Sequence, residues 1–223
     1  MVKMKKYKLV IFDLDGTLLD TSEGILSAAK YAIDKTGRSM PNQEVLESYI
    51  GPPIQQSFAK TFGIEGKELD EMALLFRNQY KDVDLLKAVP YKGIYELCQA
   101  LLDKGFILAV ATYKREDYAL KLLEHYQFDK YMDIICGSDF AGKLTKADII
   151  RKVIHFGKVK SYEDVVMIGD THHDAIGAEA LGLDFLGVTY GFGYKCSSDI
   201  VGDNVIGVAN NTSEIGTILM GAK

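Results

Sequence analysis

The sequence has few cysteines and no long apolar run. Its three cysteines lie far apart without a CxxC pair, so neither a disulfide framework nor a cysteine-bound zinc site is indicated. No apolar stretch approaches the length of a membrane-spanning helix, so we expect no contact with a membrane. The basic segment from Lys3 to Lys8 precedes an apolar run that stops at Phe12, too short for a signal peptide. We therefore expect a cytoplasmic protein.

The sequence also lacks an excess of positive charge. Its 223 residues contain 26 Lys and Arg against 31 Asp and Glu, which gives a formal net charge of -5 at pH 7. Without a stripe of basic residues, the chain is poorly suited to bind a nucleic-acid polymer. Hydrophobic residues make up 48% of the chain, enough for one domain with an insertion. We expect a monomer.

Short apolar runs predict the strands of a parallel sheet. They are rich in Val, Ile and Phe without strict alternation, which is typical of strands buried on both faces. Helical patterns lie between them, for example from Ile94 to Leu102 and from Ile149 to Ile154. This alternation predicts an α/β fold with a doubly wound parallel, Rossmann-like sheet. The runs are "KLVIFD", "FILAVAT", "DIICGS", "DVVMIGD" and "DFLGVTYG".

One segment interrupts the alternation of strands and helices. Between Thr21 and Asp84 the sequence shows helix signals but no strand, and Asp20 with Glu23 forms the pattern of a capping box. We therefore predict two domains: an α/β core of residues 1–20 and 85–223, and a small all-helical domain of residues 21–84 inserted after the first strand.

Polar residues stand at the ends of several predicted strands. Asp13 and Asp15 stand at the end of the first run, Thr112 ends the second, Asp170 ends "DVVMIGD", and Asp174 comes one helical turn later. Ligands of open α/β sheets bind beyond the carboxyl ends of the strands, so we expect these side chains to share one crevice. Clustered carboxylates need a hard cation between them, and Mg²⁺ accepts carboxylates, water and substrate phosphate as ligands.

The same residue types suit phosphate chemistry. A free carboxylate such as Asp13 is a competent nucleophile toward phosphorus, and Asp15 could protonate a leaving alcohol and then activate water. Gly16 permits a turn with positive φ, whose backbone N–H groups could hold phosphoryl oxygens together with the Thr17 and Thr112 hydroxyls. A lysine is still required, and "GKLTKAD" offers both Lys143 and Lys146.

Four motifs in this order resemble the haloacid dehalogenase (HAD) superfamily in its phosphatase branch. They are "DLDGTLLDT", Thr112, Lys146 and "GDTHHD". The segment "IGPPIQQSF" resembles the helical cap of phosphoglycolate phosphatase-like and 5′-nucleotidase-like members. The resemblance implies that the threonine and the lysine hold the phosphoryl group. It also implies that residues 21–84 form the cap of a HAD core.

The resemblance also implies roles for the acidic residues. Asp13 would form an aspartyl-phosphate, and Asp15 would be the general acid/base. Mg²⁺ would be bound by Asp13, by the backbone carbonyl of Asp15 and by Asp170. Asp174 would support the site by orienting Lys146 or a metal-bound water.

The second and fourth motifs depart from the usual pattern. Tyr113 stands where asparagine is common, which removes an amide that could hydrogen-bond the phosphate. Some nucleotidase-like members carry Thr-Ser-Lys instead, and Lys114 would match that lysine. Thr171 stands where those members often carry an arginine.

The sequence therefore predicts a Mg²⁺-dependent phosphatase that acts on a small phosphomonoester such as phosphoglycolate or a nucleoside monophosphate. Two alternatives stay open at this point. One is a sugar phosphomutase of the same superfamily, and the other is a non-catalytic phosphate-sensing module.

Overall fold

The structure, a computed structural model, describes residues 7–140 and 143–221. Most of the basic segment from Lys3 to Lys8 lies outside these residues. The chain divides into two compact units, Met1–Leu19 with Pro90–Lys223 and Asp20–Val89. We call them the core unit and the helical unit and describe each by itself. Their roles as a catalytic domain and a cap, with the predicted boundaries at residues 20 and 84, stay a prediction.

The core unit contains a six-stranded sheet in the order β5-β4-β1-β6-β7-β8. All neighbouring strands are parallel, which confirms the predicted doubly wound α/β fold. The last strand was not predicted, because a glycine interrupts its apolar run and most of its residues are only half-buried or exposed. The strands are β1 (Leu9–Phe12), β4 (Ile107–Arg115), β5 (Ile134–Ser138), β6 (Val165–Gly169), β7 (Asp184–Val188) and β8 (Val205–Ala209).

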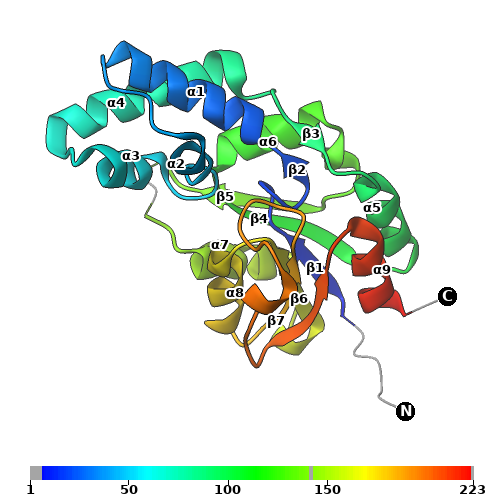
Figure 1. Cartoon of the computed structure of the whole chain (residues 1–223). Coiled ribbons are helices and arrows are strands. Elements are labelled where there is room, and N and C mark those ends of the chain that lie inside the picture. The colour runs from blue at the N-terminus through cyan, green and yellow to red at the C-terminus, as the bar shows by residue number, and fades with distance from the viewer. Residues whose placement is uncertain (1–6, 141–142, 222–223) are drawn as a thin grey trace. The chain divides into compact units, whose positions relative to one another are not determined.

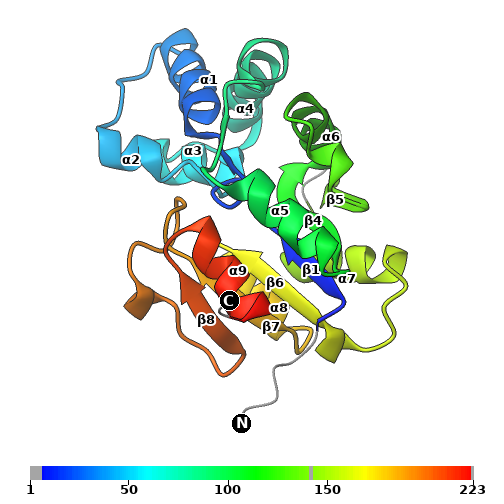
Figure 2. The same ribbon diagram turned by 90° about the vertical axis from the view of Figure 1, so that its right-hand side faces the viewer.

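Helices cover both faces of this sheet. In Figure 1, α7 (Lys146–Phe156) and α8 (His172–Glu179) lie to the left of the sheet, and α5 (Ile94–Asp103) and α9 (Thr212–Met220) lie to its right. Figure 2 shows the face covered by α5 and α9, and α6 (Glu116–His125) packs against β4 and β5. Within the described residues, short 3₁₀ turns lie at Phe128–Lys130, Tyr162–Asp164 and Ser197–Asp199.

Apolar side chains fix α7 and α8 against the sheet. The buried cluster between them contains Ile11 of β1, Met167 of β6, Phe185 of β7, and Ile149 and Ile150 of α7, all fully buried. Burying each such side chain contributes about 1.5–3 kcal/mol. This cluster therefore holds the starts of both helices at the carboxyl ends of the central strands.

The helical unit has a small aromatic core. The rings of Tyr49, Phe62 and Phe76 surround Phe58. The predicted capping box is wrong: the Asp20 carboxylate accepts hydrogen bonds from the backbone N–H and hydroxyl of Ser22. The elements are α1 (Ser22–Lys35), α2 (Gln43–Glu47), α3 (Ile54–Phe62), α4 (Gly66–Gln79) and a π-helical turn, Tyr80–Asp84.

Two short strands, β2 (Leu19–Asp20) and β3 (Val89–Pro90), pair where the chain passes between the units. Among the described residues, no helix has both the length and the apolar character needed to cross a membrane.

Replacing Phe185 by Ala should lower the free energy of unfolding by about 3–5 kcal/mol, because it leaves a cavity among fully buried side chains. Phe156→Ala is the matched control: that ring is 59% exposed, and its loss should cost less than about 1 kcal/mol. Urea unfolding followed by circular dichroism measures both values. Similar losses in the two variants would contradict the described core.

Candidate active site

The carboxyl edge of the sheet brings together three acids from separate parts of the chain. Asp13 follows β1, and its backbone N–H donates to the carbonyl of Ile168 at 2.9 Å, so β6 fixes its position. Asp170 follows β6, and Asp174 lies in the first turn of α8. All three are buried, and one carboxylate oxygen from each lies within 4.8 Å of the others. The three acids therefore form a compact, buried carboxylate cluster.

Lys146 is the lysine that reaches this cluster. Its Nζ lies 2.7 Å from Asp13 Oδ1 and 2.6 Å from Asp174 Oδ1, and its side chain is 3% exposed. Lys143 is exposed, and its backbone N–H donates to the Asp139 carboxylate. Of the two lysines that the sequence offered, Lys146 therefore contacts the carboxylate cluster and Lys143 is exposed. It also puts Asp174 in the expected place beside Lys146.

The α7 helix delivers Lys146 because of a capping box. The Thr145 hydroxyl accepts the backbone N–H of Asp148 at 3.2 Å, and the Asp148 carboxylate accepts the backbone N–H of Thr145 at 3.1 Å. Such reciprocal bonds satisfy N–H groups that a helix start leaves without carbonyl partners. The helix therefore begins at Lys146 itself.

Asp15 is paired with a second lysine. Lys114 Nζ lies 3.0 Å from Asp15 Oδ1, and both side chains are largely buried. Thr112 is buried, and its hydroxyl accepts the Lys114 backbone N–H at 3.1 Å. The prediction that the strand ends at Thr112 is wrong: β4 continues to Arg115, which pairs with Ser138 of β5. This extension gives Lys114, which the sequence offered only through a motif variant, its defined place.

A glycine-rich turn around Asp170 was missed by the sequence analysis. Asp170 Oδ2 accepts backbone N–H groups from Phe192 at 2.7 Å and Gly193 at 3.1 Å. A Cβ on Gly191 would lie 2.3 Å from the carbonyl oxygen of Gly16 and 2.4 Å from Asp170 Oδ2. The turn therefore contacts the first motif and the metal-ligand candidate together. The "GFG" sequence was its only local signal.

Gly16 and Thr17 also lie against the Asp170 carboxylate. Gly16 has φ of +83°, and a Cβ there would lie 2.3 Å from Asp170 Oδ2. The buried Thr17 hydroxyl donates to Asp170 Oδ1 at 3.4 Å. The expected positive φ at Gly16 is thus present, and both residues adjoin the cluster.

Burial dominates the electrostatics of the cluster. It raises the pKa of Asp13 well above its usual range, against the opposing charge of Lys146. Burial, with the charge of Asp174, also raises the pKa of Asp170 to about 6. Burial alone would lower the pKa of Lys146, but the charges of Asp13 and Asp174 outweigh it and raise that pKa, so the lysine stays protonated.

The charge balance fits a divalent cation. Three ionised carboxylates and one ammonium leave two buried negative charges in the cluster. Uncompensated buried charge is costly, and the raised pKa values of Asp13 and Asp170 express that cost. A hard divalent cation with oxygen ligands would remove it.

Residues 10–188 match the family described as haloacid dehalogenase-like hydrolase. The chain belongs to this family. A 5′-nucleotidase of Pseudomonas aeruginosa is 36% identical and is matched over 84% of this chain and 85% of its own length. A phosphoglycolate phosphatase of Agrobacterium fabrum is 32% identical, over 82% and 81%.

Two further matches extend over more of the chain. A tyrosine-protein kinase, PtkA of Mycobacterium tuberculosis, is 30% identical over 93% of this chain and 71% of its own length. The crystal structure of a predicted phosphatase from Clostridium acetobutylicum has a TM-score of 0.87 and 35% identity, covering 97% of this chain and all of that one. The predicted superfamily, its likeness to 5′-nucleotidases and phosphoglycolate phosphatases, and the enzyme class, a HAD-type phosphatase, are confirmed.

Replacing Gly191 by Ala should displace Asp170, because the added methyl group would overlap the carboxylate and the Gly16 carbonyl. We expect phosphatase activity to fall by at least about tenfold, since a shift of 1 Å in a catalytic site can cost about 100-fold. Gly216→Ala is the control: it lies in α9, where Ala is favoured over Gly by about 1 kcal/mol and meets only side-chain atoms. Release of p-nitrophenol from p-nitrophenyl phosphate measures both. Unchanged activity in Gly191→Ala would contradict the described turn.

Proposed function

We propose that this protein is a Mg²⁺-dependent phosphatase that hydrolyses a small phosphomonoester through an aspartyl-phosphate on Asp13. The observation that supports this most strongly is the position of the Asp13 carboxylate. It lies against the Lys146 ammonium at 2.7 Å and within the buried carboxylate cluster. The Lys146 ammonium places positive charge beside this nucleophile, and a bound divalent cation would add more, so that Asp13 could meet a phosphate dianion.

The first half-reaction transfers the phosphoryl group to the enzyme. An Asp13 oxygen bonds to phosphorus while the bond from phosphorus to the alcohol oxygen breaks. Asp15, as the acid, gives its proton to the departing alcohol. In the second half-reaction Asp15, now a carboxylate, takes a proton from water. The water oxygen bonds to phosphorus while the bond from phosphorus to the Asp13 oxygen breaks, which frees inorganic phosphate and regenerates the Asp13 carboxylate.

Other residues hold the phosphoryl group and the metal in this proposal. The Lys146 ammonium, the hydroxyls of Thr17 and Thr112, and the backbone N–H groups near Gly16 would hold phosphoryl oxygens. The Asp13 and Asp170 carboxylates and the Asp15 carbonyl would bind Mg²⁺, with Asp174 in support. When bound, Mg²⁺ supplies the positive charge that screens Asp13 from the substrate dianion.

The substrate class in this proposal is taken from the names of the relatives. Their names point to nucleoside monophosphates and phosphoglycolate, and both are small phosphomonoesters. The helical unit would act as the cap that selects among them. The cytoplasmic location, the monomeric state and the absence of nucleic-acid and membrane partners stay predictions.

Asp13→Asn should abolish turnover, because an amide oxygen is a far weaker nucleophile than a carboxylate. Asp133→Asn is a matched control at an exposed position that precedes β5, at the opposite end of the strands. We expect phosphate release from a panel of metabolite phosphates to fall at least about 1,000-fold in the first variant and to stay unchanged in the second. Metal-dependent turnover by Asp13→Asn near the wild-type rate would refute Asp13 as the nucleophile.

Removal of divalent cations with EDTA should abolish phosphate release, and added Mg²⁺ should restore it. In Asp170→Asn the Mg²⁺ concentration for half-maximal activity should rise at least about tenfold, because one anionic ligand is lost. Titration of activity with Mg²⁺ measures this shift. Full activity in EDTA would contradict the proposed cofactor.

The products distinguish the two alternatives. A sugar phosphomutase would convert a hexose phosphate while releasing little phosphate. A phosphate-sensing module would take up at most one phosphoryl group per chain. The phosphatase names among the relatives favour hydrolysis over both.

A further inference from the structure

Tyr113 contacts Lys146 at two points. The backbone N–H of Lys146 donates to the Tyr113 hydroxyl at 3.0 Å, and Lys146 Nζ lies 5.6 Å from the centre of the Tyr113 ring. An ammonium group at this distance from a ring face is attracted by the ring's π electrons. One side chain therefore touches both the backbone and the charged end of the lysine that contacts Asp13.

The hydrogen bond satisfies a backbone N–H that the start of α7 leaves without an acceptor in the helix. Lys146 is the first residue of the helix, so its N–H has no carbonyl partner within the helix. The Thr145 side chain is engaged with the backbone N–H of Asp148. The Tyr113 hydroxyl thus supplies a partner that the helix itself lacks. It anchors the backbone atom from which the long lysine side chain departs.

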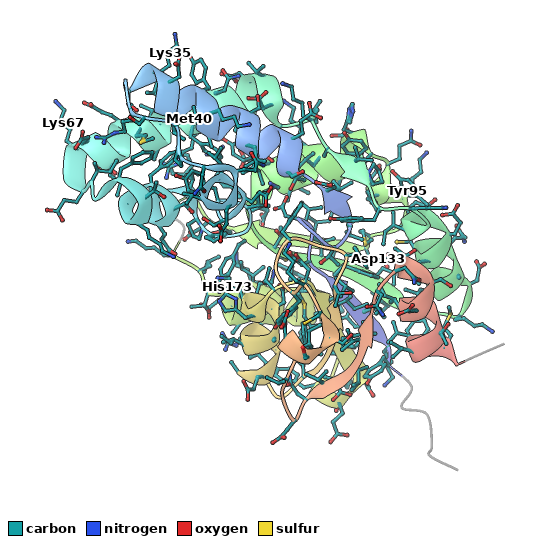
Figure 3. The ribbon with its side chains drawn as sticks, in the orientation of Figure 1. Lys35, Met40, Lys67, Tyr95, Asp133 and His173 are labelled. Atoms are coloured by element: carbon teal, nitrogen blue, oxygen red, sulfur yellow. The ribbon has the colours of Figure 1, made fainter. Side chains whose placement is uncertain are left out.

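Tyr113 also contacts a third element, the helix α8. Its ring meets the ring of His173 edge-on, with 5.5 Å between ring centres, and packs against the apolar cluster beneath α7. His173, labelled in Figure 3, directly precedes Asp174 in α8. The tyrosine therefore links β4 to the starts of α7 and α8, which carry Lys146 and Asp174.

We propose that Tyr113 is a positioning residue that fixes Lys146 between Asp13 and Asp174 for contact with the transferring phosphoryl group. The inference rests on the proposed function for its kinetic consequence. Lysine is a point charge on a flexible four-carbon stem, so its position depends on what surrounds it. In place of an asparagine amide that would contact the phosphate directly, Tyr113 acts through Lys146.

Tyr113→Phe tests this role, because it keeps the ring and removes only the hydroxyl. We expect kcat to fall about three- to tenfold, the effect of one lost hydrogen bond, while KM changes less than about twofold. The inhibition constant of orthovanadate, which mimics five-coordinate phosphorus, should rise by about the same factor as kcat falls. Unchanged kcat and vanadate inhibition, or a change in KM alone, would overturn the proposal.

Tyr95→Phe is the matched control. It also removes one tyrosine hydroxyl hydrogen bond in the core unit, to the carbonyl of Tyr126 at 2.7 Å. Tyr95 lies well away from His173 in Figure 3. We expect its kcat and vanadate inhibition to equal those of the wild type. Equal losses in the two variants would make the effect of Tyr113→Phe one of general stability and would overturn the proposal.

A second measurement needs no activity. Amide hydrogen exchange, read by NMR, should be at least about threefold faster at Lys146 in Tyr113→Phe, because its N–H loses its partner. Exchange at Asp148, which bonds to Thr145, should not change. If the wild type releases no phosphate from any ester, the proposed function fails. The exchange rate at Lys146 still shows whether its N–H donates to the Tyr113 hydroxyl. Unaltered exchange at Lys146 would overturn the inference itself.

Discussion

Three buried carboxylates lie together at the carboxyl edge of the sheet, two of them in contact with the buried Lys146 ammonium group, and much of the surrounding structure serves this arrangement. Asp13, Asp170 and Asp174 would repel one another if they were placed there alone. Lys146 lies between two of them, and backbone N–H groups of the 191–193 turn donate to the third. The negative charge that is left over makes the site receptive to a divalent cation and, with that cation, to a phosphate group.

The sheet order explains why these groups meet. Strand β1 lies between β4 and β6, so Asp13 emerges between Thr112 and Asp170. The starts of α7 and α8 face the same edge and add Lys146 and Asp174. The apolar cluster beneath both helices offsets the cost of burying charge, because it fixes their positions independently of the site.

Local sequence patterns were sufficient to predict those features of this arrangement that lie within a single segment of the chain. The apolar runs predicted five strands, and the polar residues at their ends predicted that Asp13, Asp170 and Asp174 meet. The preference for Lys146 over Lys143 was also local, because Lys146 begins the helical pattern at which Thr145 and Asp148 form a capping box. By contrast, the Lys114–Asp15 pair and the contact of Gly191 with Gly16 join residues far apart in sequence. No local propensity encodes such contacts, and β8 and the end of β4 were missed because strand pairing decides them.

The continuation of β4 past Thr112 gives two adjacent residues different tasks. Lys114 pairs with Asp15, and Tyr113 contacts Lys146 and His173. Successive side chains of a strand point to opposite faces, so a single short extension can serve two charged groups on different sides. One of these groups is the proposed proton donor, and the other is the proposed holder of the phosphoryl group. A family member with asparagine in place of Tyr113 would lack the hydroxyl that accepts the first N–H of α7. We therefore expect the residue types at the two positions after Thr112 and at the start of α7 to vary together among related sequences.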